Sequence, residues 1–145
     1  MRLVVGIGNR YRGDDAAGPL VAEVVAARHL PGVTAIECDG DPLRLLDRWA
    51  GADIAVVVDA AVVAEPRPGR WRRTEYVDLP PASASSHGLG LPEAVELGRL
   101  LDRLPALLVV YAVEAADTRL GADLSPGVRA AVDPLADIVA AEVSR

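Results

Sequence analysis

The chain has 145 residues, the size of one domain, and we expect a single domain over residues 1–145. Its net charge of −6 disfavours nucleic acid as a partner, because nucleic-acid binding depends on neutralising phosphates. Apolar residues make up 51% of the chain but aromatic residues only 3%, so the core must consist of aliphatic side chains. This composition suits a parallel sheet covered by helices.

The sequence also indicates the cellular location of the protein. Its apolar runs are too short to span a bilayer, and its N-terminus leads directly into a predicted strand rather than a signal peptide. The single cysteine, Cys38, cannot form an internal disulfide. We therefore expect a cytoplasmic protein that does not associate with membranes.

Hydrophobic periodicity predicts strands and helices that alternate along the chain. Strands are expected at residues 3–8, 33–38, 54–58, 70–77 and 106–113. Helices are expected at residues 16–30 and 42–49, from Pro92, and from Pro126 with a restart or kink at Pro134. The arginine-rich strand at 70–77 alternates charged and apolar residues, which is typical of a sheet edge. The alternation predicts a three-layer α/β fold with ligands bound beyond the carboxyl ends of the strands.

The segment 6–18, GIGNRYRGDDAAG, joins the first strand to the first helix. A dinucleotide fingerprint would need a third glycine where Tyr11 stands, and Asp14 and Asp15 would repel a pyrophosphate at the start of the helix. A P-loop is excluded because the chain has no lysine. One of the two aspartates is expected to cap the helix. The other aspartate is a candidate catalytic or metal-binding residue.

Further polar residues are expected in the crevice at the carboxyl ends of the strands, where ligands of such folds bind. Asn9 is the only asparagine of the chain, and Asp59 follows the most apolar strand. His87 lies in a loop of small residues just before a helix, a setting that favours a functional role. Two carboxylates and an imidazole suit a divalent transition metal, or a general acid/base pair with an orienting histidine. Spacing alone does not choose between these two possibilities.

Several segments together resemble the hydrogenase maturation proteases, which process the large subunit of nickel-iron hydrogenases. The first segment, VGIGNRYRGDDAAG at residues 5–18, is the most specific of them. The others are VVVDA at residues 56–60, SHGL at 86–89, YAVEA at 111–115 and LSP at 124–126. They extend over nearly the whole chain in the order that the family has them.

The resemblance implies a fold and an activity. The fold is a phosphorylase/hydrolase-like three-layer αβα sandwich, with a five-stranded, mostly parallel sheet of order 2-1-3-5-4 and an antiparallel fourth strand. The activity is endoproteolytic removal of a C-terminal extension from the hydrogenase large-subunit precursor once nickel has been inserted. No permanently bound cofactor is expected, because the nickel belongs to the substrate, although zinc or cadmium can occupy the same site.

The resemblance also implies roles for individual residues. Asp15, Asp59 and His87 correspond to the residues that contact the metal, and we expect them to be catalytic. Substrate contacts are expected from Asn9 and Asp14, and from Gly40 and Asp41, which stand where some members carry a Gly-Thr element.

Two other functions fit the same residues. A noncatalytic nickel-sensing chaperone or adaptor would bind the loaded large subunit and release it uncut. A small hydrolase acting on nucleosides or peptides would instead have a deep enclosed pocket beside Asp59. Loss of mass from the precursor would distinguish the protease from the adaptor.

Overall fold

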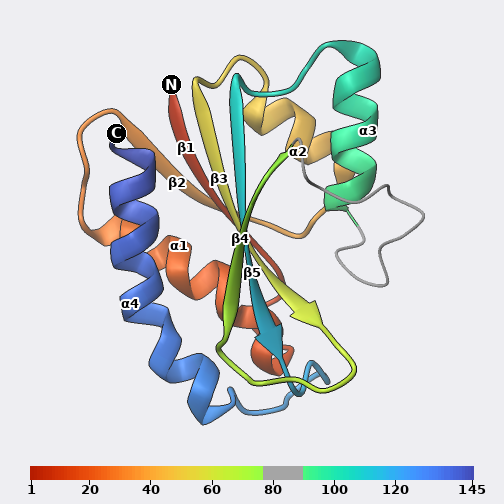
Figure 1. Cartoon of the computed structure of the whole chain (residues 1–145), viewed down its shortest axis with the longest axis vertical. Coiled ribbons are helices and arrows are strands. Elements are labelled where there is room, and N and C mark those ends of the chain that lie inside the picture. Colours follow the sequence, from red (N-terminus) through yellow and green to blue (C-terminus); the bar gives the residue numbers. More distant parts are fainter. Residues whose placement is uncertain (77–89) are drawn as a thin grey trace.

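The computed structural model describes residues 1–76 and 90–145. Five strands form one twisted sheet in the order β2-β1-β3-β5-β4 (Figure 1). They are β1 (Arg2–Ile7), β2 (Val33–Cys38), β3 (Ile54–Val62), β4 (Trp71–Glu75) and β5 (Leu107–Ala115). Neighbouring strands are parallel, except that β4 runs antiparallel to β5. The predicted strand order and directions are thereby confirmed.

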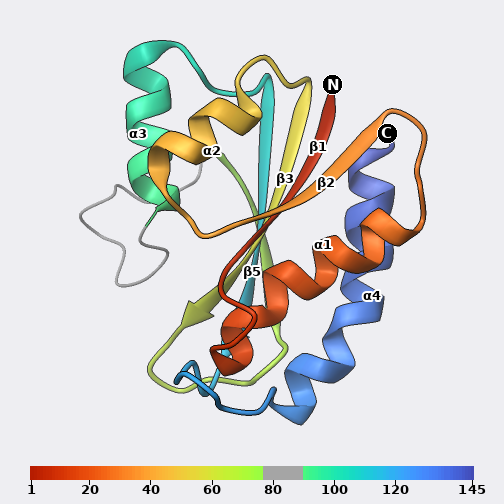
Figure 2. The same cartoon turned by 180° about the vertical axis from the view of Figure 1, so that it is seen from behind.

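Helices cover both faces of this sheet. They are the short 3-10 helix η1 (Gly13–Ala16), α1 (Ala17–Ala27), α2 (Pro42–Trp49), α3 (Leu91–Leu101) and α4 (Pro126–Val143). Helices α1 and α4 pack together on one face, and α2 and α3 pack together on the other (Figures 1 and 2). The predicted three-layer αβα arrangement is therefore confirmed. Within the described residues, no helix is both long and apolar enough to cross a membrane.

Each face of the sheet has its own aliphatic core, because successive side chains of a strand point to opposite faces. In β3, Val56 and Val58 belong to the core beneath α1 and α4, whereas Ala55 and Val57 belong to the core beneath α2 and α3. This alternation directs the next residue, Asp59, to the α2–α3 face.

The largest differences from the predicted element bounds are in β3 and in the first helix. Strand β3 continues to Val62, so Asp59 lies inside the strand rather than just beyond its end. The extra residues are held by continued pairing with β5, where Val62 lies opposite Ala115. The first helix begins as η1 and ends at Ala27, three residues earlier than predicted.

The C-terminal helix also differs from its prediction, because α4 runs from Pro126 to Val143 without a restart. Pro134 lies inside it and removes one backbone donor. Pro134 and Ala130, whose carbonyl loses that donor, are both exposed, so the carbonyl can be solvated.

The arginine-rich segment forms an edge strand, as its alternating pattern predicts. Among the strands that the structure describes, β4 pairs with β5 alone, and Arg73 reaches α4, where its Nε donates to Oε1 of Glu142 at 2.6 Å. The hydroxyl of Tyr111 donates to the same oxygen at 2.7 Å. These bonds satisfy a glutamate that is only 2% exposed and tie the edge strand to α4.

Candidate active site

The parallel strands β1, β2, β3 and β5 all end at one edge of the sheet, which we call the carboxyl edge. The connection from β1 to α1 lies there and contains Asp14 and Asp15. Close packing of two glycines brings this connection against β3. A Cβ on Gly6 would stand 2.1 Å from the carbonyl oxygen of Gly18, and one on Gly18 would stand 2.4 Å from that of Val58. Glycine at both positions lets α1 approach β1 and β3 closely.

Asp59 is a buried acid with an altered ionisation. Its side chain is 6% exposed. The pKa of Asp59 is raised to about 7, because burial and, to a smaller extent, the negative charge of Asp15 raise it more than the hydrogen bond from the backbone amide of Ala60 lowers it. A carboxyl group with this pKa can hold or release a proton near neutral pH.

Asp15 is the partner of Asp59 in this crevice. It is half-buried, and its Oδ2 accepts a hydrogen bond of 2.8 Å from the backbone N–H of Asn9. The negative charge of Asp15 contributes to the raised pKa of Asp59, so the two acids that the sequence analysis selected lie within electrostatic reach of each other. That they share one site stays a prediction.

Asn9 organises the turn that orients Asp15. Its Oδ1 accepts a hydrogen bond of 2.8 Å from the backbone N–H of Tyr11, and its carbonyl accepts one of 3.2 Å from the N–H of Arg12. Asn9 is exposed, and its Nδ2 donates no hydrogen bond to any residue that the structure describes. The amide oxygen is thus a turn element, while the exposed amide donor is placed where a substrate can meet it.

Asp14 has a different role from the one expected. It is completely buried, and its carboxylate accepts four hydrogen bonds. Two come from the backbone N–H groups of Ala116 and Asp117, at 2.8 and 3.3 Å. The other two come from the N–H and the hydroxyl of Ser125, at 2.7 and 2.6 Å. This carboxylate cannot meet a substrate in this structure, so the expected substrate contact is replaced by a structural one.

The helix cap predicted for one of the two aspartates is also absent. Residue Ala16 occupies the N-cap position of α1, and no side chain caps either η1 or α1. Burial raises the pKa of Asp14, but the bonds from Ser125 and from the backbone of 116–117 lower it below its usual range overall. Asp14 therefore remains charged and holds the segment 116–125 against η1.

The structure places Gly40 and Asp41 at the start of α2. Asp41 is the N-cap of that helix, and its Oδ1 accepts a hydrogen bond of 2.9 Å from the backbone N–H of Leu43. Gly40 is buried with φ of 91°, a conformation that favours glycine. Its carbonyl oxygen would lie 1.2 Å from a Cβ added to Gly90, so these two backbones are in direct contact.

His87 lies outside the described residues. Gly90, three positions further along the chain, packs against Gly40 at the carboxyl edge and immediately precedes α3. The chain therefore returns to the carboxyl edge just after the segment that contains His87.

The described residues contain no group of three or more His, Cys, Asp or Glu side chains able to hold a metal ion. The paired carboxylates of Asp15 and Asp59 supply oxygen ligands, which divalent transition ions accept. A third ligand would have to come from outside the described residues or from a substrate.

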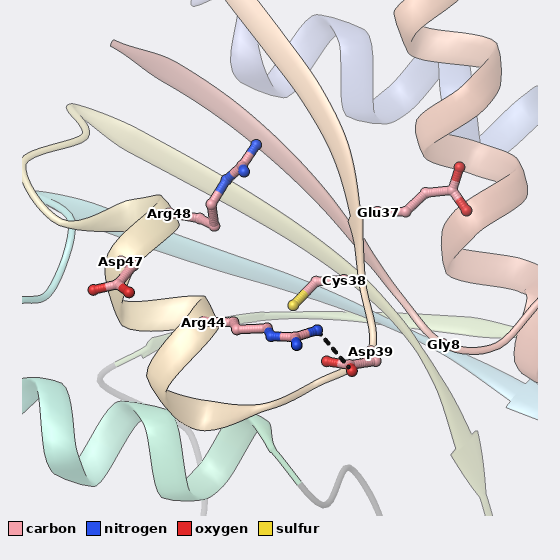
Figure 3. A pocket seen from close by; sticks show the side chains of 7 residues that line it. All are labelled: Gly8, Glu37, Cys38, Asp39, Arg44, Asp47 and Arg48. Atoms are coloured by element: carbon pink, nitrogen blue, oxygen red, sulfur yellow. Dashed lines mark hydrogen bonds and ion pairs between the residues drawn. The ribbon is translucent and has the colours of Figure 1, made fainter.

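A cavity of about 420 Å³ opens beside the end of β2 (Figure 3). Its lining combines strand ends with one face of α2, namely Gly8, Glu37, Cys38, Asp39, Arg44, Asp47 and Arg48. Arg44 bonds Asp39 at 3.2 Å across its floor. Gly8 connects the cavity to the acid pair, because a Cβ there would stand 2.0 Å from the carbonyl oxygen of Asp15. Asp59 does not line this cavity, so it is not the enclosed pocket that a small-molecule hydrolase would require.

The sequence analysis missed Ser125 as a partner of the site. The Ser-Pro pair at 125–126 has the pattern of an N-cap followed by proline, and Ser125 does occupy the N-cap of α4. Its hydroxyl makes no cap bond there and donates to Asp14 instead. No local pattern identifies this partner, because the bond joins distant parts of the chain.

Comparison with known proteins identifies the family of the chain. A family model described as hydrogenase maturation protease matches residues 19–142. The chain is 30% identical over 146 residues to the hydrogenase 2 maturation protease of Escherichia coli (strain K12), covering 96% of this chain and 88% of that relative. The alignment with this relative includes most of the first motif, at residues 5–18, whereas the family model begins at residue 19.

Solved structures with the same fold include two from Escherichia coli. The hydrogenase maturating endopeptidase HybD has a TM-score of 0.79 at 26% identity, covering 99% of this chain and 93% of that one. A solution structure of an endopeptidase has a TM-score of 0.83 at 27% identity, covering 96% and 90%. The [NiFe] hydrogenase maturation protease HycI from Thermococcus kodakarensis KOD1 has a TM-score of 0.74 at 25% identity, covering 99% and 93%. The chain therefore belongs to the hydrogenase maturation protease family, and it is a protease.

Proposed function

We propose that this protease removes the C-terminal extension of a [NiFe]-hydrogenase large-subunit precursor after nickel has been inserted. Family membership and the names of the relatives support the substrate class. The observation on which the proposal rests is the pairing of buried Asp59 with Asp15 at the carboxyl edge. A protein tail can reach an acid pair at such an edge.

The acid pair suits peptide hydrolysis because its two carboxyl groups can share one proton. The ionised group accepts a proton from water as the water oxygen attacks the scissile carbonyl carbon. The protonated group then supplies a proton to the departing amine as the C–N bond breaks. The raised pKa of Asp59 suits the proton-holding role. In the alternative mechanism, the nickel of the substrate would polarise the peptide carbonyl, and the same two acids would be ligands of the nickel.

Nickel is part of the substrate in this proposal, and no cofactor is permanently bound. Asp15, Asp59 and His87 would contact the nickel of the loaded precursor, since oxygen and nitrogen donors suit this ion. Asn9 and Asp41, which are both exposed, would contact the polypeptide next to it, and buried Gly40 would form the turn that precedes Asp41. Zinc or cadmium can serve as probes of the same site.

We also propose that the reaction takes place in the cytoplasm, without a nucleic-acid or membrane partner. The single cysteine, Cys38, cannot form an internal disulfide, and the net charge of −6 is unfavourable for phosphate backbones.

The test is incubation of the purified protein with nickel-loaded precursor, followed by mass spectrometry of the large subunit. The wild-type protein should release one C-terminal peptide, and the Asp15→Asn and Asp59→Asn variants should not. Asp133→Asn is the matched control, because Asp133 is an exposed aspartate on α4. Binding of the precursor without loss of mass would instead identify the protein as an adaptor.

A further inference from the structure

Exposed hydrophobic side chains are concentrated at the carboxyl edge. In the part of the chain that the structure describes, nine large hydrophobic residues are exposed. Six of them lie at the ends of strands or in connections at the carboxyl edge: Tyr11, Leu43, Val62, Val63, Trp71 and Leu120. Exposed apolar clusters on a folded domain commonly mark a surface that binds another protein.

Tyr11 and Leu120 are the most exposed of these six, at 76% and 70%. They come from two connections that lie side by side, because the N–H of Gly121 donates to the carbonyl of Tyr11 at 2.7 Å. The connection that holds Tyr11 follows β1, and the one that holds Leu120 follows β5, beside one another at the lower end of the sheet in Figures 1 and 2.

The same two connections are joined by hydrogen bonds next to Asp15. Asp14 holds the segment 116–125 through four hydrogen bonds, and its own backbone N–H donates to the carbonyl of Asp117 at 2.8 Å. Asp15 is the next residue along the chain. Tyr11 and Leu120 therefore lie on connections that hydrogen bonds join directly beside Asp15.

We propose that Tyr11 and Leu120 form a docking surface for the folded body of the protein substrate, next to the acid pair that cuts its tail. The inference rests on the proposed function, since a protease that acts on a large folded precursor must meet it at the edge where its acids lie. The surface is continuous with that site, and it has the composition of many protein interfaces: an exposed aromatic residue, an aliphatic residue, and arginines at positions 12 and 119 around them. The occupant is the precursor protein, recognised through apolar contact outside its extension.

The structure offers a matched control. Leu100 is 80% exposed, but it lies near the end of α3, which leads back to the start of β5 at the opposite edge of the sheet. A polar substitution there changes the surface as much as one at Leu120 without touching the proposed docking surface.

The test compares Tyr11→Ala, Leu120→Asp and Leu100→Asp with the wild-type protein. Steady-state processing of nickel-loaded precursor gives KM and kcat, and binding of the same precursor gives Kd. Tyr11→Ala and Leu120→Asp should each raise KM and Kd about tenfold, with kcat at saturation within about twofold of wild type. Leu100→Asp should leave all three unchanged. Melting temperatures should remain within a few degrees of wild type, since all three side chains are exposed.

Wild-type KM and Kd in both Tyr11→Ala and Leu120→Asp would overturn the docking surface, and so would an equal loss in Leu100→Asp. The Kd does not depend on cleavage. A precursor that the wild-type protein binds but does not cut would overturn the proposed function, while the four dissociation constants would still decide the docking surface.

Discussion

The carboxylate of Asp14 accepts two hydrogen bonds from Ser125, which lies 111 residues further along the chain. One comes from the backbone N–H at 2.7 Å and the other from the hydroxyl at 2.6 Å. Two adjacent aspartates thus have separate effects: Asp14 holds the connections at the carboxyl edge together, and the charge of Asp15 helps to raise the pKa of Asp59.

Asp14→Asn should destabilise the protein by about 2 to 3 kcal/mol, because an NH2 group replaces one carboxylate oxygen, faces donors that this oxygen accepted from, and leaves buried groups unsatisfied. Chemical denaturation at pH 7 measures the loss. The pKa of Asp14 is lowered in the folded state, so its contribution is present above its unfolded value and disappears as pH falls. The difference between the variant and wild type should therefore shrink below about pH 4. A constant difference in the free energy of unfolding from about pH 3 to about pH 7 would contradict a charged Asp14 that stabilises the fold.

Asp59→Asn should have the opposite effect on stability while abolishing processing. Because burial and Asp15 raise the pKa of Asp59 to about 7, wild-type stability should fall as pH rises from about 4 to about 7. At pH 8 the metal-free variant should be more stable than wild type by about 2 to 4 kcal/mol, since each pKa unit corresponds to about 1.4 kcal/mol. The two proteins should converge at pH 4. Equal stability at pH 8 would show that Asp59 ionises without cost.

Asp15→Asn should lower the pKa of Asp59 without returning it to the ordinary aspartate value. Burial is the larger cause of the raised pKa and the charge of Asp15 the smaller, so only the smaller part is removed. Carboxyl-carbon NMR titration of the metal-free protein measures the change. Asp133→Asn serves as the control and should leave the titration unaltered. No change in Asp15→Asn would place the two acids too far apart to act together.

Asn9→Ser should separate the two uses of the Asn9 amide. Serine retains an oxygen that can accept the turn bond from Tyr11, so stability should stay within about 0.5 kcal/mol of wild type. It lacks the amide donor, so processing should fall. The loss should be about as large as in Asn9→Ala, which removes both the amide oxygen and the amide donor. Full processing by the serine variant would make Asn9 a turn residue only.

His87→Ala should remain folded but lose binding to the nickel-loaded precursor, because the sequence places His87 among serines and glycines, where we expect a side chain to contribute little to packing. Its free energy of unfolding should change by no more than about 0.5 kcal/mol. His29→Ala, at an exposed residue following α1, is the control and should process normally. Full activity in a folded His87→Ala protein would remove His87 from the proposed site.

Local signals in the sequence determined much of the fold. Val33–Cys38 and Pro42–Trp49 were predicted with the bounds that the structure has, because apolar periodicity and an Asp-Pro start are encoded within a few residues. The candidate acids were also recognisable. A charged residue within an apolar run, such as Asp59, and a pair of carboxylates at the start of a helix are both unusual enough to attract attention.

Only the tertiary structure distinguished the role of Asp14 from that of Asp15. Sequence patterns did not distinguish Asp14 from Asp15, because the partners of Asp14 lie in the segment 116–125, and hydrogen bonds between distant segments leave no local pattern. The end of β3 was missed for the same reason, since pairing with β5 extends it to Val62. The pKa of Asp59 likewise depends on burial and on a neighbour brought close by folding. Side-chain chemistry is local to the sequence, but burial and partners exist only once the chain has folded.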